Sequence, residues 1–300
     1  MAIASPSPTQ ISPHPTPLRS PVNQRHTLLE LWHLLSLDAP TVAALWTWFI
    51  ASTCHISLPA AGIAAVFLAV WMLYAADRLL DARQLTINPL HTSGLEARHL
   101  FHHRHANAYL TGIALAAIAL GALLRHLLLH ALELYAILGA LLFVWLVLVH
   151  VHSSHHRLPK EVAVGIFFPA ATFIPTVARF PQIRLEMLPH AAILAVVCSL
   201  NCLFIHAWEH PEPRSAAHWS THYATGHLTP LAIATTIAGV ALAVIDRHTV
   251  LWPLALAASL GAFNLLVLHR ARRRISRLSL RAAADFALLT PLLFIAWSLV

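Results

Sequence analysis

The chain has 300 residues, of which 58% are hydrophobic and 10% charged, and its mean hydropathy is +0.68. This composition excludes an ordinary soluble domain and predicts a polytopic membrane protein in contact with lipid. The formal net charge of +7 does not indicate a nucleic-acid partner, because the basic residues flank apolar segments, where they act as topology signals and bind anionic lipid.

Two regions of different composition follow one another along the chain. Residues 1–26 are rich in Ser, Pro and Thr and lack an apolar run, so we expect a disordered tail and not a signal peptide. Residues 27–300 form one transmembrane domain, which opens with a short amphipathic segment at 27–38. Nine apolar stretches then follow, at about 39–57, 59–81, 106–128, 131–151, 161–178, 187–208, 228–245, 250–268 and 284–300. The sequence therefore predicts an all-α bundle of nine transmembrane helices.

The basic residues are distributed unevenly between the two sides of this bundle. The N-terminal tail, the polar loops at 82–105, 152–160, 209–227 and 269–281, and Arg78 at the end of the second stretch share one side, which carries 15 of the 19 Lys and Arg residues. The other four are Arg125, Arg179, Arg184 and Arg247. By the positive-inside rule, the richer side is cytoplasmic, with the C-terminus on the opposite side of a cell (inner) membrane.

The second apolar stretch ends in two aspartates, Asp77 and Asp81. Residues i and i+4 share one face of a helix, so both carboxylates can converge on one ligand. Carboxylate oxygens suit Mg²⁺, which keeps several waters and takes substrate phosphates as further ligands. The simpler alternative is that the two aspartates pair with Arg78 and Arg83 at the lipid headgroups.

The sixth stretch ends in a similar way, with Asn201 and Glu209 before a second long polar loop. Two acidic helix ends that face each other across a bundle are suited to hold a diphosphate through Mg²⁺. A further acid, Asp285, lies just inside the ninth stretch, and it is either part of a site or an ion-pair partner of Arg281.

The order of these motifs resembles the UbiA superfamily of intramembrane prenyltransferases. Residues 76–81, Ala-Asp-Arg-Leu-Leu-Asp, are similar to the second half of the first Asp-rich motif of that family. Residues 157–165, Arg-Leu-Pro-Lys-Glu-Val-Ala-Val-Gly, are similar to a family segment at the start of the fifth helix. Asn201, Ile205 and Glu209 keep the spacing of the second Asp-rich motif, although Ile205 replaces a carboxylate.

The resemblance implies a nine-helix bundle of the UbiA type that transfers a prenyl group from a polyprenyl diphosphate to an aromatic or other hydrophobic acceptor. It implies a site facing the cytoplasm, with Mg²⁺ as cofactor on the catalytic residues Asp77, Asp81 and Glu209. The residues implied in binding the diphosphate are Arg78, Arg83, Arg104, Lys160 and Asn201.

Two alternatives remain open on the sequence. His-x-x-His-His boxes begin at His99 and His152, and His206 and His210 add a third pair, a pattern that resembles membrane di-iron desaturases and hydroxylases. However, His occurs 23 times in the chain and Lys once, so chance boxes are expected. The other alternative is a UbiA-like bundle without catalytic activity.

Overall fold

The computed structural model describes residues 27–87, 97–151, 160–209 and 218–295, and these residues form helices and turns without any strand. The expected tail at 1–26 and the histidines at 152, 155, 156 and 210 lie outside this described part. The longer helices, in chain order, are α2 (Asp38–Thr53), α3 (Ala60–Ile87), α5 (Ala106–Leu124), α6 (Leu129–Val151), α7 (Lys160–Arg179), α8 (Leu188–Glu209), α10 (Leu228–Ile245) and α11 (Trp252–Ala271). The shorter ones are α1 (Leu28–Leu34), α4 (Ala97–Arg104), η2 (Pro181–Arg184), α9 (Trp219–Gly226), η3 (Arg272–Arg274), α12 (Arg277–Phe286) and η4 (Thr290–Phe294).

Six helices are long and apolar enough to cross a membrane, by length and composition. They are α3, α5, α7, α8, α10 and α11, and a seventh span results if α1 and α2, which meet at a bend of 92°, are taken together. The chain is therefore a polytopic helical bundle, as the composition predicts. The expected fourth stretch forms α6, but its described apolar part, Leu129–Trp145, falls short of a full span.

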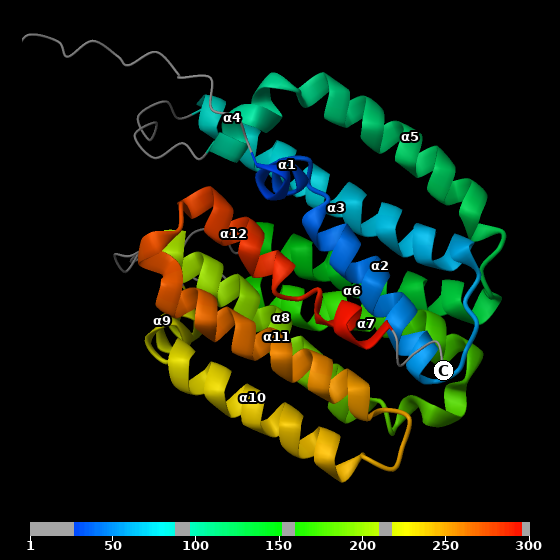
Figure 1. Cartoon of the computed structure of the whole chain (residues 1–300). Helices are drawn as coiled ribbons and strands as arrows, with labels where there is room; N and C mark the ends of the chain where they lie inside the picture. The colour runs from blue at the N-terminus through cyan, green and yellow to red at the C-terminus, as the bar shows by residue number, and fades with distance from the viewer. Residues whose placement is uncertain (1–26, 88–96, 152–159, 210–217, 296–300) are drawn as a thin grey trace, which may run out of the picture.

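The helices run side by side as a twisted stack, from α5 through α3 and α2 to α7, α8, α11 and α10 (Figure 1). Helix α7 contacts both α2 and α8, and α6 covers α7. The outer helices α5, α6 and α10 expose large apolar side chains such as Ile118, Phe143 and Ile237 (71%, 67% and 63% exposed), as expected of surfaces that face lipid. The short helices α1, α4, α9 and α12 gather at one end of the stack, called here the α1/α12 end.

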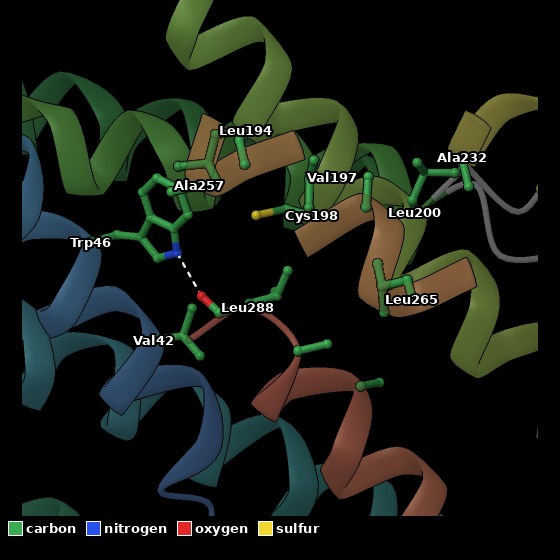
Figure 2. Packing of buried hydrophobic residues seen from close by; sticks show 14 of the residues in the cluster. Val42, Trp46, Leu194, Val197, Cys198, Leu200, Ala232, Ala257, Leu265 and Leu288 are labelled. Atoms are coloured by element: carbon green, nitrogen blue, oxygen red, sulfur yellow. Dashed lines mark hydrogen bonds between the residues drawn. The ribbon is translucent and has the colours of Figure 1, made fainter. Parts of the chain in front are cut away.

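The core lies between α2, α7, α8 and α11, with the chain after α12 closing it. Trp46 of α2 is 1% exposed, and its indole Nε1 donates a hydrogen bond of 2.9 Å to the carbonyl of Leu288 (Figure 2). Leu194, Val197 and Leu265 belong to the same cluster of buried side chains. Trp46 therefore joins the first long helix to the last part of the chain.

The expected ninth stretch, 284–300, does not form a continuous helix in its described part. Helix α12 begins at Arg277, inside the basic run, and ends at Phe286, and η4 follows after a turn. Pro291 accounts for the break, because it has no N–H to offer the carbonyl of Ala287 four residues earlier, whereas in the first turn of η4 no such bond is needed. Helix α3, in contrast, is longer than expected. It continues to Ile87, into the expected loop at 82–105, since no Pro or Gly interrupts residues 82–87.

Two contacts explain how α7 accommodates Pro175 and why it has a glycine at position 165. Pro175 has no N–H to offer the carbonyl of Ala171, and the Tyr135 hydroxyl of α6 donates to that carbonyl at 3.0 Å. Gly165 lies so close to α8 that a Cβ built on it would be 1.8 Å from Ser199 Oγ and 2.7 Å from the Ala195 carbonyl oxygen. The absence of a side chain at Gly165 is therefore what allows the two helices to approach.

Candidate functional site: a buried polar cluster

Asp77 and Arg78 are consecutive residues of α3, but the first side chain is exposed and the second is buried. Asp77 is exposed, whereas Arg78 is 4% exposed and points into the bundle. Consecutive side chains on a helix point about 100° apart, so Asp77 and Arg78 lie in different environments. Asp81 follows one turn after Asp77 on the same face of the helix; the side chains of Asp81, Arg83 and Lys160 lie outside the described part.

Arg78 is held in the interior by two neighbours. Its guanidinium carbon lies 4.3 Å from the centroid of the Tyr74 ring, and its Nη2 lies 3.5 Å from Oδ2 of Asp38, which is fully buried. Among the described residues, no acceptor forms a well-directed hydrogen bond with its N–H groups. A buried charge is costly unless it is paired, so the ion pair with Asp38 is what keeps Arg78 inside.

Asp38 reaches this position through the bend between α1 and α2. Thr27 and Glu30 form a capping box that starts α1, and Ser36 adopts a left-handed backbone (φ 57°) that turns the chain. Asp38 then starts α2, where the helix dipole favours a carboxylate, and its Oδ1 accepts from the N–H of Ala39 at 3.0 Å. The bend thus delivers an acid to the interior.

Asp38 is one member of a buried polar cluster, defined here as His33, Asp38, Arg78, Asn201 and Asp285. The Nδ1 of His33 makes a short hydrogen bond with Oδ2 of Asp38, and Asn201 Nδ2 donates to Oδ1 of Asp285 at 2.8 Å. One ligand atom each from His33, Asp38 and Asp285 lie within 4.8 Å of one another. The five residues are at most 6% exposed and come from α1, α2, α3, α8 and α12, so the cluster ties the α1/α12 end together.

A second layer of contacts fixes the bend that supports the cluster. The Ser36 hydroxyl is hydrogen-bonded to Nε2 of His102 at 3.1 Å, and the Tyr109 hydroxyl donates to the Leu34 carbonyl at 2.9 Å. The ring centroids of His102 and Tyr109 lie 4.5 Å apart, so α4 and α5 both contact the turn between α1 and α2. His102 therefore helps to hold the bend between α1 and α2.

The three residues of the second motif share one face of α8 but have different neighbours. Asn201 joins the cluster, Ile205 is buried in the core (8% exposed), and Glu209 forms an ion pair with Arg281 of α12. Of the two options for Asp285, the structure gives it Asn201 as partner, while Arg281 pairs with Glu209.

The structure brings some of the expected site residues together and separates others. Arg78 and Asn201 meet through Asp38 and Asp285, which stand between them. Asp77 is at the surface, and Arg104 is exposed at the end of α4. Two members of the histidine pattern face different helices, since His102 bonds Ser36 and His206 Nδ1 lies 3.5 Å from Glu161 Oε1 of α7.

His33 and Asp38 belong to the cluster although the sequence analysis did not single them out. The available signal was Asp38 itself, a lone acid at the start of an apolar stretch, because an ionisable residue there is expected to have a partner. His33 carried no comparable signal among 23 histidines.

The charges of the cluster define its chemistry. Two carboxyl groups face one permanently charged guanidinium, so when both are ionised and the imidazole is neutral the cluster has one excess negative charge in a low-dielectric interior. The cluster can therefore hold a cation. Comparisons with protein-family models, with curated proteins and with solved structures give no match to this chain.

Proposed function

We propose that this chain is a UbiA-type nine-helix protein that transfers a prenyl group from a polyprenyl diphosphate to an aromatic or other hydrophobic acceptor, with Mg²⁺ as cofactor. The observation that carries the proposal is the end of α3. An apolar segment from Ala60 to Leu80, long enough to span a membrane, ends in the exposed carboxylate of Asp77, with Asp81 one helical turn further. With Mg²⁺ bound to these carboxylates, such a helix end would suit a ligand with an anionic head and a long apolar tail.

The donor groups at this helix end fit Mg²⁺. Two carboxylates one helical turn apart supply oxygen ligands, which Mg²⁺ prefers together with water and phosphate oxygens. Asp77 and Asp81 would hold the ion, and Mg²⁺ would supply neutralisation of the leaving diphosphate. Glu209 fits less well, because its carboxylate is already paired with Arg281.

Other residues of the chain would bind the diphosphate, orient α3 and exclude water. Arg104 is exposed at the same end, and Arg83 and Lys160 belong to helix ends there, so they are the basic groups available to bind diphosphate oxygens. Arg78 has a different role, since its ion pair with Asp38 anchors α3 in the orientation that turns Asp77 outward. The apolar helices would exclude water from the reacting carbon.

The orientation of the site follows from the basic residues. The α1/α12 end carries the arginine-rich η3 and the start of α12, and the positive-inside rule then orients this end towards the cytoplasm of a cell membrane, with the C-terminus on the other side.

Turnover measurements on matched variants test the proposal. Membranes containing the protein receive a labelled prenyl diphosphate and a panel of aromatic acceptors, and diphosphate release is followed. Asp77→Asn and Asp81→Asn should each lower the rate on the order of 100-fold or more, because each removes a charge-stabilising group from the site. Their melting temperatures should not change, because the substitutions lie at a water-exposed helix end.

The control is Asp246→Asn, which alters a carboxylate paired with His190 (3.0 Å) at the opposite end of the bundle. This variant should keep full transfer activity. Equal release by the wild type and the Asp77→Asn/Asp81→Asn double variant would show that these carboxylates are not catalytic.

A further inference from the structure

We propose that the buried polar cluster binds one divalent transition-metal ion, with His33, Asp38 and Asp285 as ligands and the Asn201 side-chain oxygen as a fourth. This site is distinct from the surface carboxylates of α3 and does not depend on the proposed transfer reaction. One imidazole nitrogen with several oxygens suits metals of intermediate character, such as Zn²⁺, Mn²⁺ or Fe²⁺.

The first argument is convergence. One ligand atom each from His33, Asp38 and Asp285 lie within 4.8 Å of one another, and all three residues are buried. Ligands bound at about 2.0–2.2 Å from a metal ion are themselves separated by no more than about twice that distance. Three potential ligands from three different helices therefore already lie nearly as close together as a coordination sphere requires.

The second argument is unsatisfied oxygens within the same cluster. Asn201 Oδ1 and Asp285 Oδ2 are buried and have no hydrogen-bond partner among the described residues, and both residues are 6% exposed. Buried polar atoms in native proteins nearly always have a partner. A metal ion would satisfy both oxygens, and the hydrogen bond from Asn201 Nδ2 to Asp285 Oδ1 already holds the two side chains together.

The third argument is charge. With His33 neutral, as a ligand must be, Asp38 and Asp285 carry two negative charges against the single positive charge of Arg78. In the metal-bound form, these ligands would therefore offset part of the charge of the ion. Arg78, at 3.5 Å from Asp38 Oδ2, would then hold the ligand carboxylate in place as an outer partner, and a water on the ion would accept from its N–H groups.

A proton shared between the two carboxyl groups would also remove the excess negative charge, and this is the competing explanation for the cluster. A proton shared between Asp38 and Asp285 would satisfy a carboxyl oxygen of Asp285, but it would leave Asn201 Oδ1 without a donor. The two explanations differ in metal content, which can be measured directly.

The experiment uses the full-length protein purified in detergent without chelator. Metal content is measured by mass spectrometry as isolated, after removal of metal with a chelator, and after separate reloading with Zn²⁺, Mn²⁺, Fe²⁺ or Mg²⁺. We expect about one transition-metal ion per chain, no replacement by Mg²⁺, and a melting temperature about 5 °C or more higher with metal at a hundredfold excess over its Kd. Reloading with Co²⁺ should give the visible absorption of a nitrogen- and oxygen-ligated ion.

Variants locate the ion. At the same metal concentration, Asp285→Asn and His33→Gln should weaken metal binding tenfold or more and reduce the melting-temperature shift to about half or less. His190→Gln, which alters another buried histidine paired with an aspartate at the opposite end, should bind metal as the wild type does. If the variants do not fold, the chelation and Co²⁺ measurements on the wild type still decide.

A wild-type protein that takes up no stoichiometric transition metal, and whose melting temperature does not respond to it, overturns the proposal in favour of the shared proton. Equal loss of metal in His190→Gln also overturns it, because the ion would then not be at this cluster.

Discussion

Replacing Gly165 by Ala tests the close approach of α7 and α8 on which the core depends. A Cβ at this position would lie 1.8 Å from Ser199 Oγ, 3.0 Å from Ser199 Cβ and 2.7 Å from the Ala195 carbonyl oxygen. The hydroxyl can rotate away, but the carbonyl belongs to the α8 backbone and cannot move without shifting the helix. Such overpacking costs about 1–3 kcal/mol.

The magnitude can be predicted by setting this cost against the gain in helix propensity. Because the clash involves a backbone carbonyl, we expect an overpacking cost in the upper part of this range, about 2–3 kcal/mol. Ala favours a helix over Gly by about 1 kcal/mol, so the net loss in the free energy of unfolding should be about 1–2 kcal/mol. At about 2–4 °C per kcal/mol, the melting temperature in detergent should fall by about 2–8 °C. Thermal unfolding followed by tryptophan fluorescence measures this shift.

Gly121→Ala in α5 is the matched control, because a Cβ there meets nothing within 4 Å. This variant should be as stable as the wild type or slightly more stable, so the two Gly→Ala changes should differ in sign. Adding Ser199→Ala to Gly165→Ala should recover only part of the loss, since the Ala195 carbonyl remains. A Gly165→Ala protein that melts with or above the Gly121→Ala protein would refute the close approach.

Two further contacts can be tested in the same unfolding assay. Tyr135→Phe should cost about 1–3 kcal/mol, because the carbonyl of Ala171 loses its donor within the bundle, whereas Tyr223→Phe at an exposed ring should be near neutral; equal effects would contradict the role of Tyr135. For the ion pair of Glu209 with Arg281, each about one-sixth exposed, a double-mutant cycle with Glu209→Gln and Arg281→Gln should give a coupling energy on the order of 1 kcal/mol, and additive effects would mean that the pair contributes nothing.

The positions of most helices could be predicted from the sequence, because hydrophobicity is a local property. The stretch expected at 228–245 is α10, Leu228–Ile245, and the stretch expected at 187–208 is α8, Leu188–Glu209. The last stretch was less predictable, since its apolar composition did not reveal the break that Pro291 introduces and that the Trp46 indole helps to stabilise.

The candidate site was harder to predict than the helices. Spacing along one helix shows which residues share a face, and so Asp77 and Asp81 could be paired. It does not show which face turns inward, and Arg78 proves to be buried beside Asp38. The cluster joins residues as distant as His33 and Asp285, and such pairing depends on tertiary packing, which one sequence does not contain.

Binding of the prenyl donor tests the proposed function most directly, because it does not require the acceptor to be known. A non-hydrolysable prenyl thiodiphosphate is titrated into the purified protein with and without Mg²⁺, and binding is followed by calorimetry. The proposal predicts saturable binding that requires Mg²⁺ and is lost in the Asp77→Asn/Asp81→Asn double variant. Absence of binding, or binding that is equally tight without Mg²⁺ and in the double variant, would contradict it.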